Sequence, residues 1–104
     1  MKNIVKEKET QKAIMEVLEW KHIFHWRNNS GAIVSEYKGK QRFMRFGDTG
    51  SPDIFAVKDG KIIGIEVKSS IGKQSDNQKD WQERFEKAGG TYILAKSIND
   101  IITL

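Results

Sequence analysis

Two acidic residues and a lysine surround a short hairpin pattern in GSPDIFAVKDGKIIGIEVK, residues 50–68. The Asp59-Gly60 pair, which separates two apolar runs, predicts a tight β-hairpin turn. Counting back from this turn places Asp53 opposite Glu66, where side chains are about 5 Å apart and like charges repel. Strand residues alternate between faces, so Lys68 shares a face with Glu66, and Asp53 joins them from the partner strand.

A divalent cation would explain why two carboxylates face each other across this hairpin. A single lysine does not relieve their repulsion, and Pro52 fixes the backbone just before Asp53. Hard cations such as Mg²⁺ and Mn²⁺ bind carboxylate oxygens together with water and phosphate. The alternative is a surface patch in which Lys68 only neutralises Glu66. The strand around Glu66 is too apolar for an exposed edge, and the pattern therefore favours a metal site.

The composition is that of a basic protein without cysteine. The chain has 104 residues, a net charge of +4 and a sequence pI near 9.4, which predicts one domain (1–104) and favours a polyanionic partner. Without cysteine, disulfides and thiolate metal sites are excluded. No segment approaches the roughly 20 apolar residues that span a bilayer, and the charged start MKNIVKEKETQK lacks the apolar run of a signal peptide. We therefore expect a soluble, intracellular protein with no membrane partner.

The order of predicted elements favours an α/β domain. Helical spacing of apolar residues predicts a helix over 7–20, and Ser75 to Gln78 starts a second helix that Gly89-Gly90 stops. This order favours a crossover and a mixed sheet flanked by helices, in which IIGIEV (62–67) is a strand buried on both faces. The other predicted elements are strands at 22–29 and 91–95, an irregular hairpin over 32–46 bent at Gly39, and a last helical turn over 97–104.

With these elements in place, the chain resembles the VRR-NUC domains, the virus-type replication-repair nucleases of the PD-(D/E)xK superfamily. Pro52-Asp53, a spacer and Glu66-Val67-Lys68 match the core motif. The leading helix, WRNNSGA and SDNQKDWQERFEKAGGTYIL extend the similarity to stand-alone members over nearly the whole chain. The resemblance implies a small restriction-endonuclease-like core. It also implies a Mg²⁺- or Mn²⁺-dependent endonuclease acting on structured or branched DNA, such as a four-way (Holliday) junction.

The same resemblance implies roles for individual residues. Asp53 and Glu66 would bind the metal, with the backbone carbonyl of Val67 as a further ligand. Lys68 would be the catalytic lysine, which orients or activates water and balances phosphate charge. Gln78 would be the glutamine of the following helix, close to the lysine or the attacking water, although its position also fits a helix capping box.

Nuclease families of this kind supply one more acidic residue from the first helix. Glu7, Glu9 and Glu16 are the candidates. Glu7 lies on the same helix face as Ile14 and Leu18, which must pack inward, so it is the favoured ligand. A first-turn glutamate also suits the helix dipole without any metal, and this alternative stays open.

Basic residues supply candidate DNA contacts. In an extended conformation, residues 38, 40 and 42 would line one face and follow phosphates beside the metal site. A charged edge strand exposed to solvent is the alternative. Arg27, next to the NNSGA turn, is a further candidate phosphate contact. The candidates in the basic segment are Lys38, Lys40, Arg42 and Arg45.

Other residues receive ordinary structural interpretations. Trp26, Trp81 and Phe85 are expected in the core. His22 and His25 would lie on opposite faces of the strand predicted over 22–29, and therefore cannot share a metal there.

Two alternatives to a branched-DNA endonuclease remain: a non-catalytic DNA-binding module with the same fold, and the nuclease of a restriction-type system. The complete acid and lysine set opposes the first, and the short chain opposes the second. Symmetric resolution of a four-way junction needs two cuts related by a two-fold axis, which predicts a homodimer. Apolar residues at the helix and chain ends would either form its interface or fold back onto the core: Ile4, Val5, Trp20 and the tail IITL.

Overall fold

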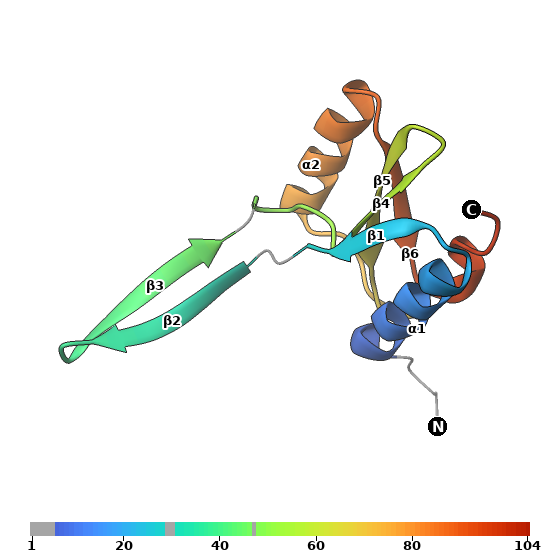
Figure 1. Cartoon of the computed structure of the whole chain (residues 1–104). Helices are drawn as coiled ribbons and strands as arrows, with labels where there is room; N and C mark the ends of the chain where they lie inside the picture. The colour runs from blue at the N-terminus through green and yellow to red at the C-terminus, as the bar shows by residue number, and fades with distance from the viewer. Residues whose placement is uncertain (1–5, 29–30, 47) are drawn as a thin grey trace.

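The body of the protein is a four-stranded mixed sheet with two helices packed against it (Figure 1). The computed structural model describes residues 6–28, 31–46 and 48–104, and for residues 31–35, 37 and 43–46 it describes the backbone alone. The sheet order is β1-β4-β5-β6, antiparallel except for the parallel β5–β6 pair. This confirms the predicted α/β fold. The elements of the body are α1 (Glu7–Trp20), β1 (Phe24–Arg27), β4 (Ile54–Lys58), β5 (Lys61–Val67), α2 (Asp76–Lys87), β6 (Thr91–Ala95) and a 3-10 turn, η1 (Ile98–Asp100).

The β4–β5 hairpin has the predicted register. Its ladder runs from Lys58–Lys61 at the turn to Ile54–Ile65 at the open end. Asp59 and Gly60 form the turn with φ of 52° and 75°, the left-handed values that two-residue hairpin turns require. Residues 63–67 of β5 are buried, as predicted for a central strand.

The two helices cover opposite faces of the sheet. Ile14 and Leu18 of α1 are fully buried against the face that carries Ile54 and Ile65. The neighbouring strand residue, Phe55, points to the other face, where its ring contacts Trp81 and Phe85 of α2. The helical spacing therefore predicted which face of each helix packs on the sheet. Trp81 and Phe85, expected in the core, are only half-buried, and α2 has no buried residue.

The first strand differs from the prediction. It covers Phe24–Arg27 rather than 22–29, because His22 has φ of 57° and belongs to the turn after α1. Trp26, expected in the core, is 41% exposed. β1 is an edge strand, so no further strand of this sheet lies beside it to help cover the Trp26 ring.

Residues 31–46 form a separate two-stranded ribbon, β2 (Gly31–Tyr37) and β3 (Lys40–Phe46). The predicted hairpin with its bend at Gly39 is confirmed, but it is regular rather than irregular, since the ladder is continuous from Gly31–Phe46 to Tyr37–Lys40. Lys38 and Gly39 form the turn with φ of 51° and 75°. The period-two pattern had predicted Lys38 on the same strand face as Lys40 and Arg42. This prediction was wrong, because Lys38 lies in the turn.

The ribbon projects away from the body (Figure 1). Within the described part of the chain, β2 and β3 contact each other and no other helix or strand. Its turn is consequently remote from the four-stranded sheet. The expectation that this basic segment lies beside the metal site was wrong for the ribbon tip.

The C-terminal segment folds onto the same core. Ile101 is fully buried and Leu104 packs against the cluster, and Lys21 Nζ donates to the Leu104 carbonyl at 2.9 Å. Ile102 and Trp20 remain exposed, while residues 4 and 5 lie outside the described residues. No helix in the described ranges is long and apolar enough to cross a bilayer.

Candidate metal centre

Three carboxylates from different segments converge at one end of the sheet. Glu7 is the first residue of α1, Asp53 directly precedes β4, and Glu66 lies near the end of β5. One oxygen from each lies within 4.8 Å of the others. The hairpin thus brings its two acids together as the register predicted, and α1 adds Glu7 rather than Glu9 or Glu16.

Glu66 is the most buried of the three acids, with 2% of its surface exposed. Its Oε1 accepts a hydrogen bond from Gln78 Nε2 at 3.0 Å and lies 3.7 Å from Lys68 Nζ. Burial, reinforced by the nearby charge of Asp53 and opposed by that of Lys68, raises the pKa of Glu66 to about 8. The fold therefore holds a carboxyl group whose negative charge is poorly compensated by the protein.

The second oxygen, Glu66 Oε2, is buried and has no hydrogen-bond partner among the described residues. Buried carboxylate oxygens are normally paired, because an unpaired one loses its hydration without compensation. A cation held also by Glu7 and Asp53 would compensate it. The three acids can therefore hold a metal ion.

Asp53 is oriented by the end of β5. Its Oδ2 accepts a hydrogen bond from the Val67 backbone N–H at 2.8 Å. This bond fixes one oxygen of the carboxylate and brings the Val67 backbone next to the acid cluster. The Val67 carbonyl remains a predicted ligand.

Asn28 holds the segment that carries Asp53, and the sequence interpretation missed it. Its Nδ2 donates to Ser51 Oγ at 2.8 Å and to the Pro52 carbonyl at 2.9 Å. Its backbone N–H donates to the Asp53 carbonyl at 2.7 Å. An asparagine directly after a strand was the available signal, but the partner segment lies more than 20 residues away in the chain.

The same segment is also held against α2 and β5. A side chain at Gly50 would collide with the Asn77 carbonyl, and its φ of 86° is one that glycine adopts readily. A Cβ at Gly64 would lie 2.9 Å from Pro52 Cγ. Trp81 Nε1 donates to Asp48 Oδ2 at 3.0 Å. Small residues at the two glycine positions thus allow the Asp53 segment to approach both elements closely.

Gln78 takes part in two interactions at once. It forms the predicted capping box, in which its Oε1 accepts from the Ser75 N–H at 2.9 Å. Its Nε2 donates to Glu66 Oε1, so Gln78 is linked to the acid, whereas one of the expectations had paired it with Lys68. Lys68 is close by, with 14% of its side chain exposed. The first turns of both helices therefore meet the acid cluster.

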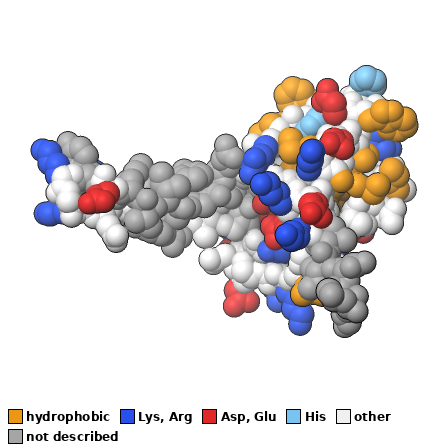
Figure 2. Space-filling view, turned by 90° about the horizontal axis from the view of Figure 1, so that it is seen from below, with side chains coloured by type: hydrophobic (Ala, Val, Ile, Leu, Met, Phe, Trp, Pro, Cys, Tyr) orange, Lys and Arg blue, Asp and Glu red, His pale blue; other side chains and the backbone are white. Residues whose placement is uncertain are grey.

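The candidate DNA contacts fall into two regions. Arg27 ends β1 and faces α1, whereas Lys38, Lys40 and Arg42 are exposed at the ribbon tip. The side chain of Arg45 lies outside the described residues. Figure 2 shows the separation, with basic and acidic side chains at the end of the ribbon and, apart from them, basic and acidic side chains on the body.

Comparison with known proteins agrees with the acid cluster. The family model described as VRR-NUC domain matches residues 2–99, which is nearly the whole chain. No curated protein and no solved structure matches. The VRR-NUC family is a family of PD-(D/E)xK-type nucleases, and the three-acid cluster is a site that can hold the metal on which such chemistry depends.

Proposed function

This chain belongs to the VRR-NUC family, and on that premise we propose that it is a Mg²⁺- or Mn²⁺-dependent endonuclease of DNA. The observation that carries the proposal is Glu66 Oε2, buried beside Asp53 and Glu7 with no hydrogen-bond partner among the described residues. A purely structural ion pair with Lys68 would involve the other oxygen, Oε1, and would leave Oε2 unexplained. A bound cation accounts for all three acids.

Each residue of the cluster has a distinct proposed role. Glu7, Asp53 and Glu66 would hold the cation, with the Val67 carbonyl as a further ligand. When bound, the cation would supply charge stabilisation to the phosphate and acidify a water molecule.

Lys68 and Gln78 both approach Oε1 of Glu66. The Lys68 ammonium would orient the attacking water and balance negative charge as the new P–O bond forms and the bond to the leaving sugar oxygen breaks. Gln78 donates to Glu66 Oε1, so its proposed role is to position that carboxylate.

We assign structured or branched DNA, with the four-way junction as one candidate, as the substrate. The net charge of +4 and the exposed cations favour a polyanion. Arg27 would contact phosphates near the cut. Lys38, Lys40 and Arg42 at the ribbon tip, together with Arg45, would contact phosphates farther along the DNA, because the ribbon projects from the body.

Paired cutting of a four-way junction would require a homodimer. The described residues contain one three-acid cluster, and one such site cuts one strand. Two copies related by a two-fold axis would place two clusters on opposite strands. Light scattering over a dilution series, with and without a four-way junction, tests this. A persistent monomer that only nicks DNA would contradict the homodimer and leave the nuclease proposal intact.

Cleavage assays on linear, flapped and four-way DNA test the proposed activity. Each substrate is incubated with Mg²⁺, Mn²⁺ or EDTA. We expect cleavage by the natural chain only with metal, none by Asp53→Asn, and cleavage at the natural rate by Asp80→Asn. Asp80 is an exposed residue on α2 and serves as the matched control. Binding of DNA without cleavage under any condition would instead support the non-catalytic DNA-binding module.

A further inference from the structure

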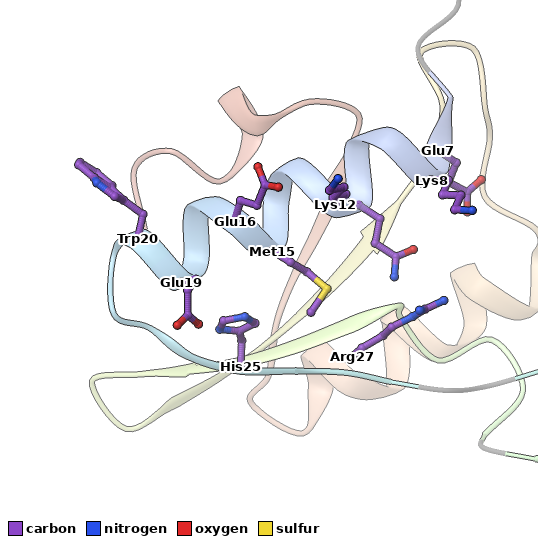
Figure 3. A pocket seen from close by; sticks show the side chains of 10 residues that line it. Glu7, Lys8, Lys12, Met15, Glu16, Glu19, Trp20, His25 and Arg27 are labelled. Atoms are coloured by element: carbon purple, nitrogen blue, oxygen red, sulfur yellow. The ribbon is translucent and has the colours of Figure 1, made fainter.

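A groove of about 970 Å³ runs between α1 and β1 (Figure 3). Glu7, one of the three clustered acids, lines one end of it, and Trp20 lines the other. A ligand in this groove would therefore be continuous with a phosphate bound at the acids. We propose that the groove binds an unpaired DNA strand, so that the substrate carries unpaired nucleotides beside the cut. This inference rests on the proposed nuclease function. It specifies that, among branched DNA substrates, the protein prefers those with an unpaired strand next to the cut.

The dimensions of the groove fit a single strand of a few nucleotides. From Glu7 to Trp20, α1 is about 20 Å long at 1.5 Å per residue. This length matches about six nucleotides at the stacked spacing of about 3.4 Å, and fewer in an extended strand. A volume near 970 Å³ is at the upper end of small-molecule sites, which is too small for a double helix between α1 and β1.

The end of the groove near the metal centre is arranged for phosphates. Lys8 and Lys12 lie one helical turn apart on α1, and Arg27 faces them from the end of β1 (Figure 3). A cation at Glu7 would offset the negative charge at that end. A strand leaving the acid cluster would thus meet three basic side chains first, which is the contact that a sugar-phosphate backbone requires.

The other end of the groove is arranged for bases. Glu16 and Glu19 on α1 would repel a phosphate, but carboxylates accept hydrogen bonds from the ring N–H and amino groups of unpaired bases, including the N3–H of thymine. His25 Nδ1 lies 2.7 Å from the Ile23 carbonyl. Because that carbonyl can only accept, Nδ1 donates to it, and Nε2 is the ring nitrogen left to contact a base.

Trp20 provides a stacking surface just beyond the end of the groove, for a strand that continues past the last turn of α1. It is 78% exposed, and Figure 3 shows it directed outward from the last turn of α1. Bases stack on exposed aromatic rings irrespective of their identity. In a duplex the Watson–Crick edges are paired and the base faces are stacked on each other, so these acceptors and this ring favour an unpaired strand.

Binding and cleavage are measured separately to test the proposal. Binding of a fluorescent eight-nucleotide oligothymidine to the protein is measured in the presence of Ca²⁺. Cleavage is measured in Mn²⁺ on a duplex with splayed arms and on the same duplex fully paired. The variants are Lys12→Ala and Trp20→Ala, and Lys61→Ala at the far end of the β4–β5 hairpin is the matched control.

We expect the oligothymidine to bind and each groove variant to weaken binding about fivefold or more, as loss of a stacking or phosphate contact does. KM for the splayed substrate should rise by a similar factor, with kcat and Mn²⁺ affinity unchanged. Lys61→Ala should behave as the natural chain does. Absence of oligothymidine binding, or equal binding by both groove variants and the natural chain, would overturn the proposal.

The outcomes also separate this proposal from the nuclease function. If paired DNA is cut with metal as fast as splayed DNA, and the groove variants have no effect, the nuclease proposal stands and the groove proposal falls. If the variants weaken oligothymidine binding but no DNA is cut with any metal, the groove proposal stands and the nuclease proposal falls.

Discussion

Glu66→Gln should stabilise the metal-free protein at neutral pH. The Glu66 side chain is 2% exposed and its pKa is raised from 4.5 to about 8, first by burial and then by the charge of Asp53. Between these two pH values the unfolded chain releases a proton that the folded chain retains. The free energy of unfolding therefore falls as pH rises from 4.5 to about 8. At pH 7 it is lower by about 3 kcal/mol than it is below pH 4.5. Glutamine keeps the shape of the side chain and removes this ionisation.

Thermal unfolding in EDTA from pH 5 to pH 8 measures the effect. The natural chain should lose stability steadily with rising pH, and Glu66→Gln should lose less. At pH 7 we expect the variant to have a Tm higher by about 12 °C, since about 1 kcal/mol shifts Tm by about 4 °C in a domain of this size. Mn²⁺ should raise the Tm of the natural chain by mass action and leave that of the variant unchanged.

Glu86→Gln is the control, because Glu86 is an exposed glutamate on α2. It should follow the pH profile of the natural chain and retain the Mn²⁺ response. If the natural chain has the same Tm from pH 5 to pH 8 and Glu66→Gln is no more stable than Glu86→Gln, burial does not penalise this carboxylate. The argument from Glu66 to a cation site would then lose its basis.

Three further substitutions probe the chemistry, the positioning and the packing of the site. Lys68→Ala should retain Mn²⁺ binding and reduce kcat at least about a hundredfold, because it removes a charge that acts on the reacting phosphate. Asn28→Ala should weaken Mn²⁺ binding about tenfold, measured by titration calorimetry, because it frees the segment that carries Asp53. Gly64→Ala should lower the free energy of unfolding by about 1–3 kcal/mol in urea, since the new methyl group would overlap Pro52.

Each of these expectations has a contradicting outcome. Cleavage at the natural rate by Lys68→Ala would remove the catalytic assignment, with Lys61→Ala as the control for charge. Unchanged Mn²⁺ affinity in Asn28→Ala, judged against Asn99→Ala at the exposed 3-10 turn, would show that the Asp53 segment holds its place without Asn28. An unchanged urea midpoint in Gly64→Ala would show that Pro52 moves aside at no cost.

The hairpin that carries the acids could be predicted because two local rules determine it. The Asp59-Gly60 turn sets the pairing, and the two-residue period of a strand then decides which side chains share a face. The ladder from Lys58–Lys61 to Ile54–Ile65 follows that count. The approach of Asp53 to Glu66 needed no information from the rest of the chain.

The course of residues 31–46 could not be predicted in the same way. The sequence indicated a turn at Gly39, but the direction in which a ribbon leaves the body depends on its contacts, and β2 and β3 contact no other described helix or strand. Lys38 adopts φ of 51° in the turn, which the period-two argument did not anticipate. The exposure of Trp26 likewise depends on β1 being the sheet edge, a property of strand order rather than of local sequence.

The arrangement of the candidate site depends on contacts between distant segments. Glu66 is buried at a cost in stability, and the surrounding fold must supply that stability elsewhere. Asn28, at the end of β1, donates a hydrogen bond to the Asp53 segment, and Gln78, in the first turn of α2, donates one to Glu66. Gly64 has no side chain, so Pro52 can pack directly against β5. None of these pairs is close in sequence. Asp53 and Glu66 could be identified from one hairpin, whereas the contacts of Asn28 and Gly64 that keep them in place could be identified only from the packed structure. A carboxylate buried with one oxygen unpaired is consistent with a scaffold built to receive a charge that the chain itself does not provide.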